Sequence, residues 1–464
     1  MANASNFFRN PSVGSIDTTE RYKSLGLRDN PFPSKPGVRV DSEDIRSNGT
    51  IYEASVRNTE QDEFEQIFLP GPKNPHAKIC AFVMDYATSS GRGIGKTAFL
   101  NYQTRRINED WGQGATGGQQ LTFAVRIQPV AETRKFWEFA KLIAKSLIDE
   151  GVLAKAMWRI RYFHKDIPDE VRSKVTDPET TIGSDTWLRD QGIEPLFFSE
   201  HIRDDLEKIG IPADIAKKLA YFGNDHDRFS ETFMDVESDL FWRKHGNQFV
   251  FDWLVNIFRY AGISNGLLLV DEVEKIVLYQ NKSERRSFVE SLRYCFFDGE
   301  YENTKSSFYR ILLTIHPYVQ ELLLPHWEAS GMDRFAALSR ELSKNYTIYF
   351  NPIENAMAVS MTRKYLEQFQ LSNANPNGNH LHPFDDQAII ESTLLTKGVP
   401  GKLLTFLHEM VEHAVGKGAT TISAEFIREF ATTPTRKAHE SDDGLSPEPL
   451  KNPVANLKGD GLGV

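Results

Sequence analysis

The sequence predicts an α/β fold, in which a parallel β-sheet carries helices on both faces. Short apolar runs alternate along the chain with longer segments whose apolar residues recur at helical spacing. Such alternation is typical of parallel strands joined by crossover helices. In addition, one apolar run is followed by a glycine-rich loop and another ends in two acidic residues. Polar residues at strand ends are expected where an open parallel sheet binds its ligand.

The predicted strands are apolar runs with few charges, as expected for strands that are buried on both faces. They lie at 78–87, 120–128, 266–271, 308–315 and 346–350. Helical patterns lie between them, and the clearest is TRKFWEFAKLIAKSLIDE at 133–150. Its apolar residues recur at the spacing of one helix face: Phe136, Phe139, Ala140, Ile143 and Leu147.

A chain of 464 residues is long enough for more than one domain. Residues 1–45 are polar and contain prolines, and we expect an extended arm there. The strands place an α/β core at 46–352 and leave a helical segment at 353–432. Within the core, about 151–245 is too long for a simple crossover and is expected to be a helical insertion. The tail, 433–464, lacks apolar periodicity and is expected to be disordered.

Composition excludes several classes of protein. The two cysteines, Cys80 and Cys295, lie far apart on apolar runs, which supports neither a disulfide framework nor a zinc module. No apolar stretch reaches a membrane span and the first residues are no signal peptide, so we expect a cytoplasmic protein without membrane contact. The net charge of −10 argues against autonomous tight binding of DNA, although a local basic patch or a partner could still hold it.

The glycine-rich loop SSGRGIGKTAFL matches most of the phosphate-loop (Walker A) pattern G-x-x-x-x-G-K-[ST], with Ser90 where the first glycine is usual. It lies between a predicted strand and a predicted helix, Thr97 to Ile107, which is the context that the motif requires. Its glycines allow backbone N–H groups to converge on phosphate, Lys96 would reach the β- and γ-phosphates, and Thr97 would bind Mg²⁺. The candidate nucleotide-binding residues are Ser90, Gly91, Arg92, Gly93, Ile94, Gly95, Lys96, Thr97 and Ala98.

The run GLLLVDEVEK, at 266–275, supplies the second half of a nucleotide site. It predicts a buried strand whose carboxyl end carries Asp271 and Glu272 (Walker B). Asp271 is placed to hold Mg²⁺ through water, and Glu272 to polarise the attacking water. With the phosphate loop upstream, the pair predicts an enzyme that binds ATP and Mg²⁺ and hydrolyses the nucleotide.

The C-terminal third narrows the class of P-loop NTPase. Residues 384–430 resemble the helical lid of AAA+ ATPases, particularly the origin-recognition-like branch and the ExeA/TniB-type ATPases. The stretch 398–404 (GVPGKLL) matches their G-x-P-R-x-L-L element except that Gly401 stands at the arginine, and Lys402 is the candidate replacement toward the nucleotide. The segment 30–32 (NPF) also resembles the entry of ExeA-like proteins. The resemblance covers about 25–432 and implies an AAA+ (ASCE) core followed by a lid at 353–432.

The resemblance also implies two catalytic positions and an oligomer. The polar sensor at the tip of the strand after Walker B corresponds to Thr314 or His316, and His316 is preferred because it directly precedes Pro317. An interfacial arginine that acts on a neighbouring subunit corresponds to Arg334 in GMDRF. The alternative for Arg334 is a surface residue at a helix end. The interfacial arginine implies a homo-oligomer.

Two functions remain open. The resemblance favours an ATPase that couples its nucleotide state to a DNA-directed partner assembly, in a mobile-element, DNA-modification or anti-phage system. It would contact DNA directly or through partner proteins from the same operon. The alternative is a STAND-like signalling ATPase that gates a separate effector. A motor for protein substrates is less favoured because no pore-loop aromatic residue is evident after the second strand.

Two further patterns have alternative interpretations. The stretch 158–165 (WRIRYFHK) interleaves aromatic and basic residues, which suits nucleic-acid binding, but an amphipathic helix end with inward aromatic residues is favoured. HEMVEH, at 408–413, is no zinc-protease motif, because its histidines are five residues apart and lie on different helix faces.

Overall fold

The structure is a computed structural model. It describes residues 18–35, 37–38, 42–71, 74–85, 93–109, 121–175, 183–222, 226–234, 239–339, 343–372 and 379–432. The chain forms two compact units, a core unit and a helical unit. The core unit holds the described residues of 36–353 together with 399–401, and the helical unit holds those before 36 and the remainder after 353. The tail that the sequence predicts to be disordered, 433–464, lies outside the described residues.

The core unit is built on a five-stranded sheet in which every strand pairing is parallel. The strand order is β2-β3-β4-β1-β5, so β3, the strand before Asp271, lies between β2 and β4. The predicted α/β class and parallel sheet are therefore confirmed. The strands are β1 (Cys80–Asp85), β2 (Leu121–Ile127), β3 (Ile263–Val270), β4 (Tyr309–Ile315) and β5 (Thr347–Phe350).

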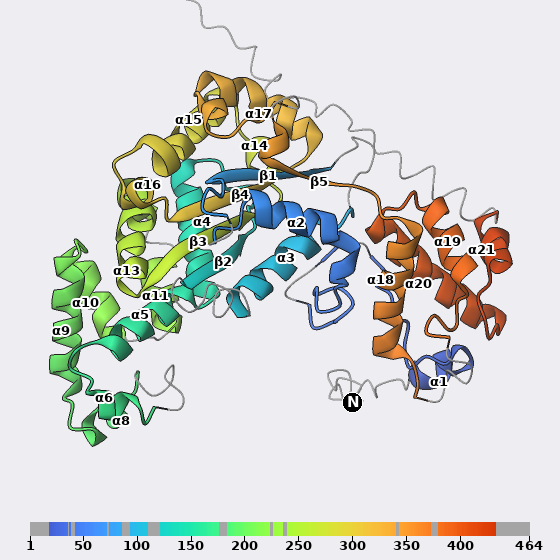
Figure 1. Ribbon diagram of the computed structural model, residues 1–464, viewed down its shortest axis with the longest axis horizontal. Helices are drawn as coiled ribbons and strands as arrows, with labels where there is room; N and C mark the ends of the chain where they lie inside the picture. Colours follow the sequence, from blue (N-terminus) through green and yellow to red (C-terminus); the bar gives the residue numbers. More distant parts are fainter. Residues whose placement is uncertain are drawn as a thin grey trace, which may run out of the picture. The chain divides into compact units, whose positions relative to one another are not determined.

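Both faces of the sheet are buried, which is why its strands are continuous apolar runs rather than alternating ones. On β3, Leu267 and Leu269 join the apolar cluster under α2 (Asn58–Ile67) and α3 (Lys96–Arg106). Leu268 and Val270 join the larger cluster on the opposite face. Helices cover both faces of the sheet (Figure 1). The helices that contribute to the larger cluster include α4 (Phe136–Asp149), α13 (Leu254–Tyr260), α15 (Lys282–Arg293) and α17 (Pro317–Ala329).

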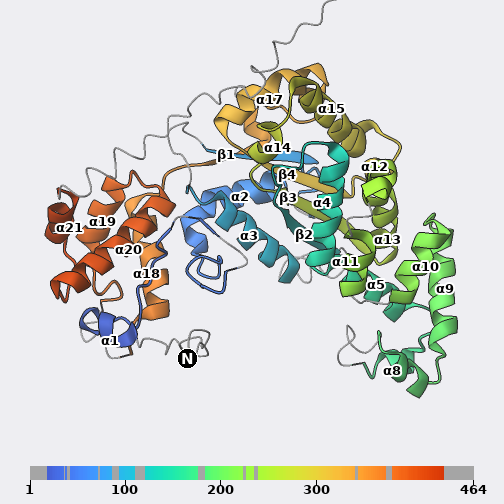
Figure 2. The same cartoon turned by 180° about the vertical axis from the view of Figure 1, so that it is seen from behind.

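Helices occupy the long segment between β2 and β3. Within it, α11 and α12 pack against α4, and α9 and α10 pack against each other (Figure 2). The helices after α4 are α5 (Val152–Phe163), α6 (Asp169–Arg172), α8 (Asp185–Asp190), α9 (Pro195–Lys208), α10 (Ala213–Phe222), α11 (His226–Met234) and α12 (Asp239–Gln248). A π-helical stretch, η6 (Phe249–Trp253), then leads into α13.

Short helices complete the core unit. They are η3 (Ala54–Arg57), α14 (Glu274–Val277), η7 (Tyr294–Asp298), α16 (Glu302–Ser306), η8 (Met332–Arg334) and η9 (Ser343–Asn345). In the described part of the chain, no helix is both long enough and apolar enough to cross a lipid bilayer.

The helical unit contains α1, η2 and the C-terminal helices, and its N-terminal segment corrects the expectation of an extended arm. Asn30 Nδ2 donates hydrogen bonds to the backbone carbonyl of His408 (3.1 Å) and to Glu412 Oε1 (2.9 Å). Phe32 is fully buried, with its ring near that of Tyr365. Burial of this aromatic residue and satisfaction of the Asn30 amide anchor the segment. The elements are α1 (Thr18–Tyr22), η2 (Lys23–Leu25), α18 (Asn355–Phe369), α19 (Asp386–Leu395), α20 (Pro400–Lys417, of which 402 onward belongs here) and α21 (Ala424–Ala431).

Candidate functional site

Polar residues meet where the central strands of the core unit end. Parallel pairing places Val270 opposite Leu313 of β4 and Ile127 of β2, so the residues that follow lie at one edge of the sheet. Asp85 ends β1 at the same edge, because Met84 pairs with Ile315. Ligands of open α/β sheets bind outside the carboxyl ends of the strands. The strand register therefore assembles a site from segments far apart in the sequence.

The described part of the phosphate loop contains two glycines with left-handed backbone conformations. Gly93 has φ 97° and Gly95 has φ 102°, a region that side-chain-bearing residues rarely adopt. Gly95 caps α3, whose first turn contains Lys96, Thr97 and Ala98. The free N–H groups of this turn and the helix dipole favour an anion there. Of the predicted loop residues, Ser90, Gly91 and Arg92 lie outside the described residues.

Arg57 holds the phosphate loop by a hydrogen bond to its backbone, a role that the sequence did not indicate. Its Nη2 donates to the carbonyl of Ile94 (2.6 Å), and its Nη1 donates to Glu60 Oε1 and to the carbonyl of Asn351 (both 2.7 Å). The arginine and glutamate side chains are nearly inaccessible, at 6% and 7% exposure. Charge-assisted hydrogen bonds in such a buried place hold the loop in one conformation. No local motif marks Arg57, because the two backbone carbonyls that it binds, those of Ile94 and Asn351, are distant along the chain.

Lys96 is paired with Asp85, the last residue of β1. Its amine lies 2.7 Å from Asp85 Oδ1, and the Asp85 side chain is only 1% exposed. The other oxygen, Oδ2, is buried without a hydrogen-bond partner among the described residues. A buried carboxylate with this little support depends on the lysine for its charge. Phosphate oxygens would compete with Asp85 for the amine. The only sign of Asp85 in the sequence was that a charged residue ends an apolar strand.

The Asp271 carboxylate lies beside the first turn of α3. Burial raises the pKa of Asp271, against the lowering effects of a hydrogen bond with Thr97, the charge of Arg126 and a hydrogen bond with Thr314. Asp271 Oδ2 is buried without a hydrogen-bond partner among the described residues. A hydroxyl and an incompletely satisfied carboxylate are the hard oxygen donors that Mg²⁺ takes, alongside waters and nucleotide phosphates. The residues present therefore fit Mg²⁺ held by Thr97 and Asp271.

Glu272 has an unusual backbone. Its φ of 54° is left-handed, which costs free energy in a residue with a side chain and is found often at functional sites. Its N–H donates to Thr314 Oγ1 (2.8 Å), which holds this conformation. The side chain is one-third exposed, with Oε2 2.5 Å from Lys275 Nζ and 3.4 Å from Gln128 Nε2. Burial also raises the pKa of the next acid, Glu274, whose charge interacts with Lys96.

Of the two sensor candidates, Thr314 is hydrogen-bonded to both acidic residues. Thr314 is buried, and its hydroxyl donates to Asp271 Oδ1 (3.2 Å) while it accepts from Glu272 N–H. His316 lies beyond the strand as the N-cap of α17, where Nδ1 accepts from the N–H of Tyr318 (3.3 Å). A side chain that bonds both Walker B residues can position them. The structure therefore favours Thr314 over the preferred sequence candidate.

The two remaining predicted residues, Arg334 and Lys402, belong to other elements of the fold. Arg334 ends η8, after α17, and its side chain is exposed, which both of its sequence interpretations allow. Lys402 is exposed near the start of α20, in the helical unit. Both assignments stay predictions.

The aromatic-basic stretch in α5 is largely part of the packing. Arg161 is 2% exposed, donates to the carbonyl of Ala220 (3.1 Å) and lies over the ring of Phe198. Burial lowers the pKa of Arg161 to about 10. Arg159 donates to the carbonyl of Ala261 (2.8 Å), whereas Lys165 is exposed. Arg161 therefore cannot contact a phosphate backbone without leaving the core, whereas Phe163 is 56% exposed and does not pack inward as the packing interpretation expects.

We expect Arg161→Ala to lower the free energy of unfolding by about 2 kcal/mol or more. The variant loses a hydrogen bond from a charged group and leaves a buried carbonyl at Ala220 without its donor. Lys165→Ala, four residues on and exposed, should change it by less than about 0.5 kcal/mol. Urea unfolding of both variants measures the difference. Equal stability of the two variants would contradict a packing role for Arg161.

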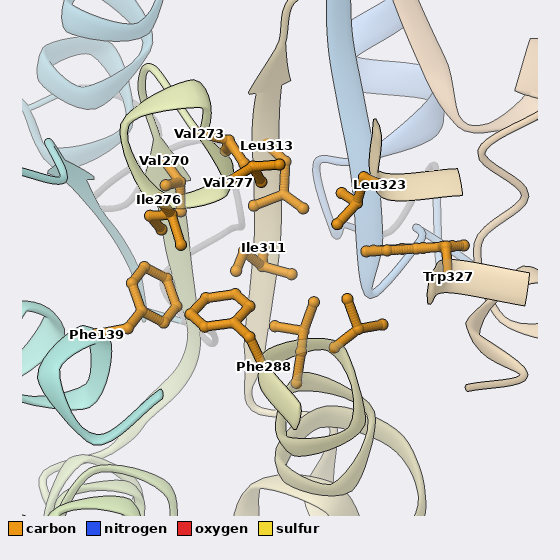
Figure 3. A pocket seen from close by; sticks show the side chains of 12 residues that line it. Phe139, Val270, Val273, Ile276, Val277, Phe288, Ile311, Leu313, Leu323 and Trp327 are labelled. Carbon is orange, nitrogen blue, oxygen red and sulfur yellow. The ribbon is translucent and has the colours of Figure 1, made fainter. Parts of the chain in front are cut away.

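A small apolar cavity lies behind the Walker B turn, on the face of the sheet covered by α14, α15 and α17 (Figure 3). Its volume is about 20 Å³, enough for one water, but its lining offers no polar partner, and such cavities stay dry. It is therefore a packing feature and not the nucleotide pocket. Its lining includes Val270, Val273, Ile276, Ile311, Leu313 and Trp327.

Comparison with known proteins gives one distant structural likeness. No protein-family model and no curated protein matches the chain. Among solved structures, the chain is similar to Cdc6p from Pyrobaculum aerophilum, with 12% sequence identity and a TM-score of 0.35, over 80% of this chain and 68% of that chain.

Proposed function

We propose that this protein binds ATP with Mg²⁺ and hydrolyses the bond to the terminal phosphate. The observation that carries the proposal is the meeting of two distant motifs at one sheet edge. The Thr97 side chain, in the first turn of α3, interacts with Asp271 at the end of β3. Next to them lie Lys96, a partly buried amine at a helix N-terminus, and Glu272, a carboxylate that solvent reaches.

In this mechanism each residue acts on a stated atom. Lys96 leaves Asp85 and donates to oxygens of the β- and γ-phosphates, while the N–H groups of the α3 turn bind the same phosphates. Thr97 and Asp271 hold Mg²⁺, which neutralises charge on the phosphates when bound. Glu272 accepts a proton from water as the water oxygen bonds to the γ-phosphorus. The bond to the β-phosphate oxygen breaks, and ADP and phosphate result.

Thr314 supports the reaction by positioning the two acidic residues. Its hydroxyl links Asp271 to the backbone of Glu272, so the two acidic residues keep a fixed relation. Thr314 is therefore the residue that we propose as the sensor at the tip of the strand after Walker B. Residues held by a second shell of hydrogen bonds lose less free energy when they take up a catalytic geometry.

We expect Lys96→Ala to weaken ATP binding by about 10- to 100-fold and to abolish hydrolysis. The variant loses charge-assisted hydrogen bonds to phosphate, each worth about 1.5–3 kcal/mol. It also leaves the Asp85 carboxylate buried and unpaired, which would destabilise the protein. The double variant Lys96→Ala/Asp85→Asn removes that charge and should recover stability without recovering ATP binding.

Calorimetric binding of ATP and thermal unfolding measure the two effects separately. Asp85→Asn alone is the matched control, and it should bind ATP at least as tightly as the native protein because phosphate no longer competes with a carboxylate. Native-like ATP affinity in the double variant would contradict the proposed phosphate loop.

We further propose that this ATPase forms a homo-oligomer and couples its nucleotide state to a DNA-directed partner assembly. The resemblance of 384–430 to AAA+ lids supports this more specific function. Because the chain is acidic overall and Arg161 is buried, we favour contact with DNA through a partner. ATP turnover measured with and without DNA and the partner tests it. Turnover that responds to neither would favour the signalling alternative.

A further inference from the structure

Arg126, at the carboxyl end of β2, lies against the acid that we assign to Mg²⁺. Its Nη1 is 3.5 Å from Asp271 Oδ2, and the two side chains are 14% and 2% exposed. Parallel pairing brings them together: Arg126 lies opposite Leu269 on β3, two residues before the acid. Nothing in the sequence around Arg126 marks it as part of a nucleotide site.

The pair is close but poorly satisfied. Neither Nη1 of Arg126 nor Oδ2 of Asp271 has a hydrogen-bond partner within the described ranges, although both atoms are buried. A charge-assisted hydrogen bond between such groups would be about 2.7–2.9 Å long, so 3.5 Å leaves the donor and the acceptor incompletely satisfied. Burying a guanidinium N–H and a carboxylate oxygen in this way is costly.

A nucleotide and its metal would satisfy both atoms. The carboxylate oxygen would gain a cation, and the guanidinium group would gain phosphate oxygens, which its planar set of donors matches better than a lysine does. Arg126 is already at the sheet edge where Lys96 and Thr97 begin α3. Its Nη2 donates to Gln128 Oε1 (3.3 Å), and Gln128 Nε2 reaches Glu272 Oε2 (3.4 Å). The arginine is therefore linked to both acidic residues of the Walker B pair.

We propose that Arg126 is a phosphate-binding arginine that acts within its own subunit. In the free protein it is paired with Asp271, and its guanidinium group moves to the terminal phosphate of ATP when Asp271 engages Mg²⁺. This inference rests on the proposed function. Arg126 would contact only the third phosphate, which ADP lacks. The protein would therefore distinguish ATP from ADP through a residue on β2.

The test compares the affinities of ATP and ADP, each with Mg²⁺, by calorimetry. Arg126→Gln should weaken ATP binding by about tenfold or more, the loss expected for a charged hydrogen bond, and ADP binding by less than about twofold. Arg126→Lys should fall between, since lysine keeps the charge but not the planar donors. Arg134→Gln is the matched control, because Arg134 is a more exposed arginine paired with Glu284, and it should leave both affinities unchanged.

Thermal unfolding without nucleotide tests whether Arg126 and Asp271 are paired in the free protein. Arg126→Gln should lower the melting temperature by leaving Asp271 buried without its cation, and the double variant Arg126→Gln/Asp271→Asn should regain part of the loss.

The outcomes separate the two proposals. A native protein that binds neither nucleotide overturns the proposed function itself. If the native protein binds ATP and the Arg126→Gln variant binds it with the same affinity, only the role of Arg126 is overturned. Equal weakening of ATP and ADP in Arg126→Gln also overturns it, because a structural residue would affect both nucleotides alike.

Discussion

A Glu272→Gln variant is expected to bind ATP as tightly as the native protein and to hydrolyse it about 10²- to 10⁴-fold more slowly, the range of a general base. The amide keeps the size of the side chain and cannot accept the proton of the attacking water. The left-handed backbone at this position is held by Thr314, whose bond to the Glu272 N–H is independent of the side chain. Single-turnover phosphate release and equilibrium binding of ATP measure the two quantities.

Glu274→Gln is the matched comparison, because Glu274 is a partly buried acid two residues on, and its charge interacts with Lys96. Its turnover should stay within a few-fold of the native rate, a range far smaller than that expected for loss of a general base. If Glu274→Gln loses turnover and Glu272→Gln keeps it, the base is Glu274. The exposed Lys275 partner of Glu272 adds little, since exposed ion pairs contribute about 0–1 kcal/mol.

An Arg334→Ala variant is expected to lose about 10³- to 10⁵-fold in turnover, the range measured for arginine fingers, with little change in ATP affinity. Arg334 is exposed on η8, as a residue that reaches a neighbouring subunit must be. Its charge would stabilise the transition state and not the bound ground state. Turnover per subunit should therefore rise with protein concentration, and ATP should favour a larger assembly.

Mixing two inactive variants tests whether Arg334 acts on a neighbour. An Arg334→Ala subunit retains Lys96, and a Lys96→Ala subunit retains Arg334, so a mixed interface can assemble one complete site. Part of the activity should return on mixing. If the mixture stays inactive although the two variants demonstrably co-assemble, Arg334 does not act in trans, and its alternative as a surface residue at a helix end is favoured.

The elements of the sheet were predictable because their signal is local. A strand buried on both faces is mostly apolar, and apolar residues predominate in the five strands although β2 and β4 each contain an arginine. The motif residues were recognisable for a related reason. Lys96 and Thr97 must begin a helix directly after a glycine turn, and Asp271 and Glu272 must end a strand, so spacing along the chain identifies them.

The sequence did not show which side chains on neighbouring strands contact each other. Arg126 and Thr314 contact Asp271 only because β2 and β4 lie on either side of β3. The sequence could not decide between Thr314 and His316 for the same reason: a position next to proline does not indicate which side chain contacts Asp271.

The sequence by itself determined the α/β class, the strands and the phosphate-loop and acidic motifs, because each depends on patterns within a few residues. Only the tertiary structure decided that β3 lies between β2 and β4, that Arg161 is buried, and that Asn30 and Phe32 pack into the helical unit. An arginine or an amide carries the same local signal on a surface as in a core. Its burial and its partner are set by segments that meet only after the chain has folded.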